Sequence, residues 1–202
     1  MSEYSTENRF IFKRFFFLQK QKRIKGTAQE NKIDFFGANS YTFNMNANRE
    51  PLKNRLQTAR RIKHLCEQYY RDLTLCFVMK DGKQIPLSDL SLKEYFDFVR
   101  QIPYRRDPRP IEIVARPYYI IKHRSLGMDC KKKGTLICSF LRIKNYKYRA
   151  IGSSSRPDGQ IHHIYFELYD PKMKQWKTVD ATYPDYKLFE IKTEETNREV
   201  LK

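Results

Sequence analysis

The sequence predicts an α+β fold in which a helix that begins at a cysteine packs on an antiparallel sheet. Residues 126–141 (LGMDCKKKGTLICSFL) place Cys130 before apolar positions that have the spacing of one helix face. Residues 161–182 (IHHIYFELYDPKMKQWKTVDAT) contain two stretches of alternating polarity around a short turn, which is typical of paired antiparallel strands. Because both patterns have an apolar side to bury, we expect the helix to lie on the strands.

The first predicted element is an amphipathic helix over residues 51–73, where apolar side chains recur at every third or fourth position. Cys66 falls on the apolar stripe of this helix and is interpreted as a packing residue. A β-hairpin follows over residues 73–87, because Asp81-Gly82 is a strong signal for a tight turn between two short strands.

A second helix is predicted over residues 91–102. Ser91 stands at the N-cap position and Glu94 three residues later, which together make a capping box. Pro103 ends this helix, and residues 105–118 are expected to form an extended connection that leads to the cysteine.

The two predicted strands place a histidine opposite a carboxylate. A four-residue turn over residues 170–173 sets His163 directly across from Asp180, with Cβ atoms about 5 Å apart. A carboxylate in that position can hold the tautomer and the orientation of an imidazole. A slip by one residue would exchange His163 for His162, whose apolar neighbours favour a core or edge position.

Cys130 has two interpretations. At the start of a buried helix, the free N–H groups and the helix dipole favour negative charge and therefore a thiolate. Lys131, Lys132 and Lys133 act in the same direction electrostatically, although cations are unfavourable in a first helical turn. The alternative is a solvated basic turn that happens to carry a cysteine.

Composition restricts the partners and the compartment. The chain has 202 residues and a formal net charge of +17, which favours nucleic acid, an anionic membrane surface or an acidic protein as partner. Its four cysteines form no CxxC pair and have no histidine at ligand spacing, so we expect free thiols and no metal site. Without a long apolar stretch or a signal-peptide pattern, the sequence predicts a non-secreted, cytoplasmic protein that has no transmembrane segment.

The chain divides into three parts: residues 1–48 are expected to be an N-terminal arm and linker, residues 49–190 the main domain, and residues 191–202 a polar, solvated tail. The arm interleaves basic and aromatic side chains over residues 9–25, which is typical of segments that bind polyanions. The alternative is a basic strand or helix folded against its own domain. The arm residues that we expect to contact nucleic acid or a partner protein are Lys13, Arg14, Lys20, Lys22, Arg23 and Lys25.

Three motifs in order resemble the transglutaminase-like branch of the papain-like cysteine enzymes. They are Gly-Met-Asp-Cys before a helix, His-Ile-Tyr-Phe-Glu on a strand, and Trp-Lys-Thr-Val-Asp-Ala-Thr on the next strand. The stretch FVRQIPYRRDPRPIEIVARP is similar to the segment before the cysteine in bacterial and bacteriophage members, so the resemblance covers residues 90–185. It implies that the nucleophile, the general base and acid, and the orienting carboxylate are Cys130, His163 and Asp180, with Trp176 and Asp129 as supporting residues.

The resemblance implies a papain-like or transglutaminase-like core and a thiol-dependent acyl-transfer enzyme. Its default reaction is hydrolysis of an amide or peptide bond in a protein or peptide substrate, without a cofactor. Two features depart from the family pattern: Lys131 and Lys132 replace acidic or polar residues of many relatives, and Gly134 replaces an alanine. The alternative function is a catalytically inactive protein of this fold that serves as a structural or binding component. Such a component would suit a bacteriophage virion, with the basic arm on nucleic acid or a partner protein.

Overall fold

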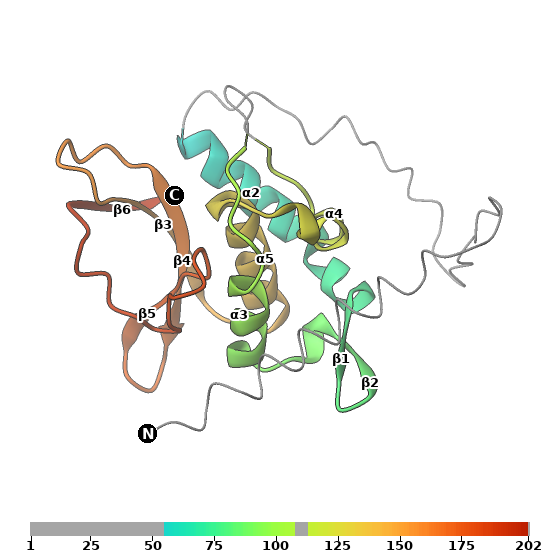
Figure 1. Cartoon of the computed structure of the whole chain (residues 1–202). Coiled ribbons are helices and arrows are strands. Elements are labelled where there is room, and N and C mark those ends of the chain that lie inside the picture. Colours follow the sequence, from blue (N-terminus) through green and yellow to red (C-terminus); the bar gives the residue numbers. More distant parts are fainter. Residues whose placement is uncertain (1–54, 108–112, 202) are drawn as a thin grey trace, which may run out of the picture. The chain divides into compact units, whose positions relative to one another are not determined.

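The computed structural model describes residues 55–107 and 113–201, whose arrangement is shown in Figure 1. The helices in this part of the chain are α2 (Arg55–Tyr69), α3 (Leu92–Arg100), α4 (Pro117–Lys122) and α5 (Cys130–Ile143), with short 3-10 helices at Tyr70–Leu75, Leu87–Asp89 and Arg124–Leu126. The strands are β1 (Phe77–Lys80), β2 (Lys83–Pro86), β3 (Tyr148–Ser154), β4 (His163–Asp170), β5 (Gln175–Val179) and β6 (Asn197–Leu201). Helices dominate the first half and antiparallel strands the second half, which confirms the predicted α+β class.

The predicted helices and the hairpin before the cysteine are confirmed where the structure describes them, whereas the expected extended connection over residues 105–118 ends in α4, which begins at Pro117. Helix α2 lies within the predicted helix over residues 51–73, and Cys66 is buried. Strands β1 and β2 form the predicted hairpin, in which Asp81 and Gly82 have φ angles of 49° and 76°. Positive φ at both central residues is the backbone conformation of the tightest hairpin turns.

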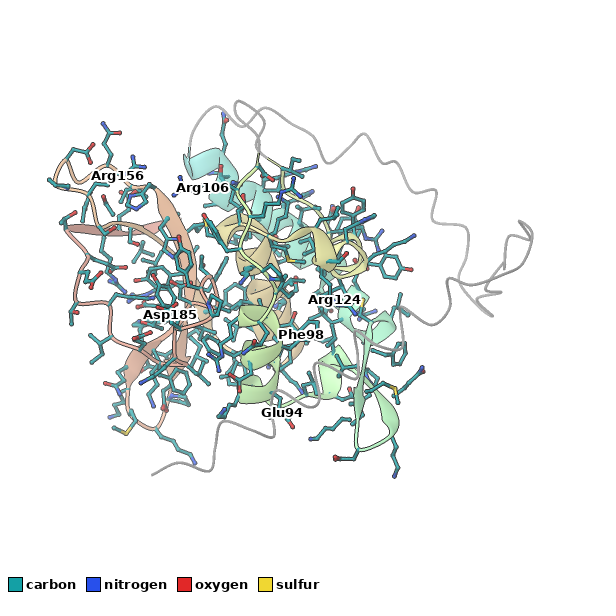
Figure 2. The ribbon with its side chains drawn as sticks, in the orientation of Figure 1. Glu94, Phe98, Arg106, Arg124, Arg156 and Asp185 are labelled. Atoms are coloured by element: carbon teal, nitrogen blue, oxygen red, sulfur yellow. The ribbon has the colours of Figure 1, made fainter. Side chains whose placement is uncertain are left out.

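Helix α3 has the predicted capping box. The Ser91 hydroxyl accepts a hydrogen bond from the Glu94 N–H at 3.3 Å, and the Glu94 carboxylate accepts one from the Ser91 N–H at 2.9 Å. Figure 2 shows Glu94 near this end of α3. Two backbone N–H groups that the helix itself cannot satisfy are thereby paired.

Helix α5 contacts β4 of the main sheet as well as α2 and α3 (Figure 1). Its large buried apolar side chains are those that the spacing predicted, Leu136, Ile137, Phe140 and Leu141. The rings of Tyr95 and Phe140 stack with centroids 4.1 Å apart, and the Tyr95 hydroxyl donates to the Leu136 carbonyl at 3.1 Å. Burial of a side chain of this size contributes about 1.5–3 kcal/mol, so α5 is firmly held.

The close approach of α5 to β4 involves Gly134. A Cβ atom at this position would lie 3.2 Å from the ring of Phe166 on β4. Since the Phe166 ring is buried, it occupies part of the space that an alanine at this position would need. Packing therefore accounts for glycine at a position where the family resemblance implies alanine.

The main sheet has the strand order β5-β4-β3-β6, and every neighbouring pair is antiparallel. Strand β6 extends one edge, with Ile151 opposite Val200 and Ser153 opposite Arg198. The prediction of a solvated tail over residues 191–202 is therefore wrong. Most of β6 is exposed, so its residues have the composition of a tail, and backbone pairing with β3 determines their conformation.

Strands β4 and β5 pair two residues away from the predicted register. Tyr169 lies opposite Trp176, where the predicted turn over residues 170–173 would have placed Lys174. The turn instead follows Asp170, whose carboxylate accepts hydrogen bonds from the N–H groups of the second and third residues after it, at 3.0 and 3.2 Å. Lys174 ends the turn with a φ angle of 51°.

This difference in register preserves the predicted faces of both strands. Because side chains alternate with a period of two, a shift by two residues keeps each one on its side of the sheet. His163 and Asp180 therefore stay on the same face, as diagonal neighbours and not as a directly opposed pair.

Candidate active site

Cys130 is positioned by the turn that precedes α5. The Met128 N–H donates to the Pro103 carbonyl at 2.8 Å, and the Met128 carbonyl accepts from the Arg105 N–H at 3.0 Å. Gly127 has a φ angle of +81°, and a Cβ atom on it would lie 2.7 Å from the Cβ of Arg105. The glycine thus satisfies both a positive φ and a close approach of two chain segments.

Helix α5 begins at Cys130, and Asp129 is its N-cap. The buried Asp129 carboxylate accepts a hydrogen bond from the Lys132 N–H at 3.1 Å, which gives this predicted supporting residue a clear local role. All four cysteines lie in the described residues and are free thiols. Cys130 is partly exposed, whereas the other three are buried, so the accessible thiol is the one at a helix N-terminus.

Carboxylates surround the first two lysines after Cys130. Lys131 forms ion pairs with Asp129 and, at 3.7 Å, with Asp107. Lys132 forms ion pairs with Asp107 and, at 3.8 Å, with Asp129. The interpretation as a solvated basic turn is therefore wrong. The positive charge that was expected to favour a thiolate is also partly compensated by two carboxylates.

Lys133 is buried and lies beside the end of β5. Its Nζ donates to the carbonyl of Thr182 at 2.8 Å and to that of Arg100 at 3.3 Å. Burial lowers the pKa of Lys133 to about 8, although the charge of Asp180 raises it. This lysine connects α5 to the segment that carries Asp180.

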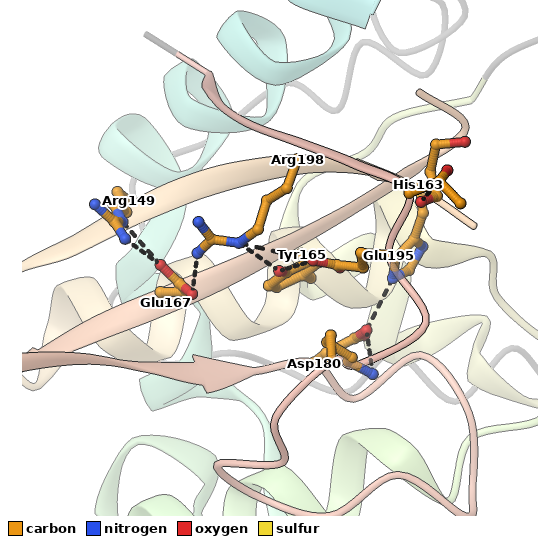
Figure 3. A network of polar contacts seen from close by, with 10 residues as sticks. Arg149, His163, Tyr165, Glu167, Asp180, Glu195 and Arg198 are labelled. Carbon is orange, nitrogen blue, oxygen red and sulfur yellow. Dashed lines mark hydrogen bonds and ion pairs between the residues drawn. The ribbon is translucent and has the colours of Figure 1, made fainter. Parts of the chain in front are cut away.

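His163 begins β4, Asp180 follows β5, and a hydrogen bond joins them (Figure 3). The imidazole Nε2 lies 2.8 Å from Asp180 Oδ2, while Asp180 Oδ1 accepts from the Thr182 N–H at 3.0 Å. The Asp180 side chain is 2% exposed and that of His163 17%. The imidazole also stacks on the ring of Tyr165 with centroids 5.7 Å apart. With Nε2 bound to Asp180, Nδ1 is the nitrogen left for another partner.

Neighbouring groups determine the protonation of His163 and Asp180. Burial lowers the pKa of His163, but the Asp180 carboxylate and the neighbouring Cys130 raise it by more, to about 10. Burial raises the pKa of Asp180, but His163 and Lys192 hold it well below its ordinary value. This effect of Cys130 on the imidazole means that the thiol lies close to it, so the structure brings Cys130, His163 and Asp180 together.

Lys192 also lies next to Asp180, a contact that was not predicted from the sequence. Its Nζ lies 3.1 Å from Asp180 Oδ2 and 3.0 Å from the centroid of the Tyr186 ring. A lysine in a polar stretch gives no local signal for such a position. Recognition of the strand at 197–201 could have indicated this position. A chain that returns to the sheet after β5 can bring Lys192 close to the end of β5.

Aromatic side chains lie near the thiol. The rings of Tyr104 and Tyr183 have centroids 4.8 Å apart, and those of Tyr183 and Tyr186 5.2 Å apart. Burial, Tyr104 and the neighbouring Cys130 raise the pKa of Tyr183 to about 12. Exposed Arg106 (Figure 2) hydrogen-bonds Tyr104, which raises the pKa of the guanidinium. None of these residues was predicted, because segments far apart in the sequence bring them together.

Trp176 is placed apart from these residues. It pairs with Tyr169 near the turn between β4 and β5. The ring centroids of these two residues are 5.3 Å apart, and the Arg149 guanidinium carbon lies 4.2 Å from the centroid of the Trp176 ring. His163 lies six residues from Tyr169 along β4, a separation of about 20 Å in a strand. The predicted supporting role of Trp176 is therefore wrong as a direct contact with the predicted catalytic residues.

The buried carboxylate of Glu167 lies on β4 between His163 and Tyr169 and forms ion pairs with two arginines. Glu167 forms ion pairs with Arg149, at 2.7 Å, and with Arg198 of β6 (Figure 3). Arg198 Nε donates to the Tyr165 hydroxyl at 3.3 Å. The ring that supports His163 is thus tied to the last strand of the sheet.

His162, the alternative histidine, points elsewhere. It is exposed, and its Nδ1 lies 3.2 Å from the carbonyl oxygen of Gln160. The basic residues of the arm, Lys13, Arg14, Lys20, Lys22, Arg23 and Lys25, lie outside the described residues, so their contact with nucleic acid or a partner protein stays a prediction.

The raised pKa of His163 predicts a loss of stability in alkaline solution. The imidazole titrates at about 10 in the folded protein and near 6.5 in an unfolded chain, so its stabilisation is complete below pH 6.5 and is lost as the pH rises toward 10. We expect the unfolding free energy of the wild type to fall by more than about 1.4 kcal/mol over this range, relative to a His163→Asn variant, in urea titrations. The lowered pKa of Lys133 raises the unfolding free energy as the pH increases above about 8, but this effect is equal in both proteins. Parallel pH profiles would contradict the prediction.

Within residues 55–107 and 113–201, no helix combines the length and the apolar composition that crossing a membrane requires. Comparison with protein-family models, with curated proteins and with solved structures gives no match for the chain. Its function therefore has to be inferred from the chemistry of the residues described above.

Proposed function

We propose that the protein is a thiol-dependent acyl-transfer enzyme that hydrolyses an amide or peptide bond through Cys130, His163 and Asp180. The observation that carries the proposal is the partly exposed Cys130 thiol at the start of α5, beside an imidazole whose Nε2 lies 2.8 Å from a buried carboxylate. Covalent catalysis by a thiol requires a nucleophile next to a base, and a further group that orients the base. The resemblance to transglutaminase-like enzymes supports the same three roles and a papain-like core.

In the first half of the reaction, the Cys130 thiolate attacks the carbonyl carbon of the substrate. A C–S bond forms, and the carbonyl π electrons move to the oxygen. The His163 imidazolium then donates its proton to the leaving nitrogen as the C–N bond breaks, which leaves an acyl thioester on Cys130. Asp180 stays ionised and holds the ring.

In the second half, neutral His163 takes a proton from water, and the resulting hydroxide oxygen attacks the thioester carbon. The C–S bond breaks, the carboxylic acid leaves, and the thiolate and imidazolium are restored. The backbone N–H of Cys130 lies in the first turn of α5, where N–H groups have no acceptor within the helix, so it can donate to the oxyanion. An amine in place of water would give a cross-linked product by the same steps.

The test is a comparison of products. The purified protein is incubated with a mixture of unfolded polypeptides, and new termini and deamidated side chains are identified by mass spectrometry. We expect the wild type to release products at least about a thousandfold faster than Cys130→Ser or His163→Ala, and His162→Ala to match the wild type. Identical product maps for the wild type and Cys130→Ser would refute the proposal and favour the inactive structural protein.

A further inference from the structure

We propose that Lys192 is a positioning residue that shares the Asp180 carboxylate with His163 and so limits how strongly the carboxylate favours the imidazolium. The inference rests on the proposed function, since it concerns the group that must give up and regain a proton in each cycle. It adds a fourth member, from the segment after β5, to the three residues of the proposed mechanism.

The geometry places two cations on one oxygen. Asp180 Oδ2 lies 2.8 Å from His163 Nε2 and 3.1 Å from Lys192 Nζ, so the two nitrogens cannot be more than about 6 Å apart. The Lys192 side chain is 13% exposed, and the Tyr186 ring lies 3.0 Å from its Nζ. A lysine enclosed in this way is a fixed charge at the site and not a mobile surface group.

A carboxylate that interacts with two cations stabilises each of them less than a carboxylate that interacts with only one, because the two cations repel each other. If Lys192 were neutral, the whole charge of Asp180 would stabilise the His163 imidazolium, and the repulsion between the two cations would disappear. The imidazole would then release its proton only at a higher pH. Lys192 thus keeps the imidazole able to act as a base after the acyl thioester has formed.

Other charged or titratable groups also face His163 and Asp180, and the expected effect has to be separated from theirs. They are Cys130 and Lys133 on α5, Tyr165 on β4, and Tyr186 on the segment that carries Lys192. Each of them remains in a Lys192 variant, so a difference between variant and wild type reports the ammonium group alone.

The experiment is a pH titration of histidine side chains by NMR on protein with isotopically labelled histidine, from pH 5 to about 12.5, so that a midpoint above that of the wild type is still covered. In Lys192→Met, we expect the midpoint of His163 to rise by about one pH unit or more. Lys192→Arg, which keeps the charge, should restore the wild-type midpoint. Lys172→Met removes the same charge from the exposed turn between β4 and β5 and should leave His163 unchanged.

The outcomes separate this inference from the proposed function. A merely structural role for Lys192 would lower stability without moving the midpoint, so an unchanged midpoint in a folded Lys192→Met protein refutes the inference. If that variant does not fold, Lys192→Gln takes its place with the same expectation. The proposed function is tested independently by Cys130→Ser, which should lower the His163 midpoint; without that effect there is no thiolate–imidazolium pair.

Discussion

The His163→Ala variant is expected to slow the alkylation of Cys130 by iodoacetamide at pH 6 to 7 by at least about tenfold, while His162→Ala leaves the rate unchanged. Iodoacetamide reacts with thiolate, and an isolated cysteine is only a few per cent thiolate at pH 7. In the proposed mechanism the neighbouring His163 imidazolium stabilises the Cys130 thiolate, and His163→Ala removes that charge. The neighbouring His162 is exposed and its Nδ1 lies at a backbone carbonyl, so it provides a matched control.

The position of alkylation has to be read by peptide mapping, because the chain has four free thiols. Cys66, Cys76 and Cys138 are buried and should react only when the protein unfolds, so they report whether each variant is folded. Equal rates at Cys130 in both histidine variants would show that the imidazole next to the thiol does not generate a thiolate. The proposed mechanism would then lose its first step.

Gly127→Ala should lower the free energy of unfolding by at least about 3 kcal/mol, whereas Gly82→Ala should lower it by about 1 kcal/mol. Both glycines have positive φ angles, +81° and +76°, but the ψ angle of Gly127 is 162°, a backbone conformation that is essentially restricted to glycine, so an alanine would be strongly strained there. Only at Gly127 would the new methyl group clash, because Arg105 Cβ would be 2.7 Å away. At Gly82 no heavy atom outside its chain neighbours lies within 4 Å.

Chemical denaturation of the two variants measures this difference directly. Cys130 should also be alkylated slowly in the folded fraction of Gly127→Ala. The added methyl group pushes the start of α5 away from residues 103–105 and therefore moves the thiol relative to His163. A Gly127→Ala protein as stable as Gly82→Ala would mean that the two segments separate without cost. The turn before α5 would then not be what fixes the thiol.

Those parts of the fold that depend on neighbouring residues could be predicted from the sequence. The capping box of α3 involves Ser91 and Glu94 alone, and the β1–β2 turn depends on Asp81 and Gly82. The face of each residue on β4 and β5 follows from alternation alone. For that reason the pair of His163 and Asp180 could be predicted although the register was wrong by two residues.

The parts that were missed depend on contacts between distant segments. Nothing near residue 192 in the sequence indicates that this lysine binds a carboxylate twelve residues earlier, since the bend between β5 and β6 brings it there. The ion pairs of Lys131 and Lys132 depend on Asp107, which lies more than twenty residues before these lysines in the sequence. A pattern of charges shows which residues carry charge, but the tertiary fold decides which charges meet.

The strand order of the main sheet has a consequence for synthesis of the chain. Strand β3 pairs with β4 on one side and with β6 on the other, yet β6 is made more than forty residues after β3. Until the ribosome has released residues 197–201, one edge of β3 presents unpaired backbone groups, and such an edge is a template for strands of other chains. A shortened chain that ends before residue 197 would therefore keep this edge of β3 open and tend to aggregate.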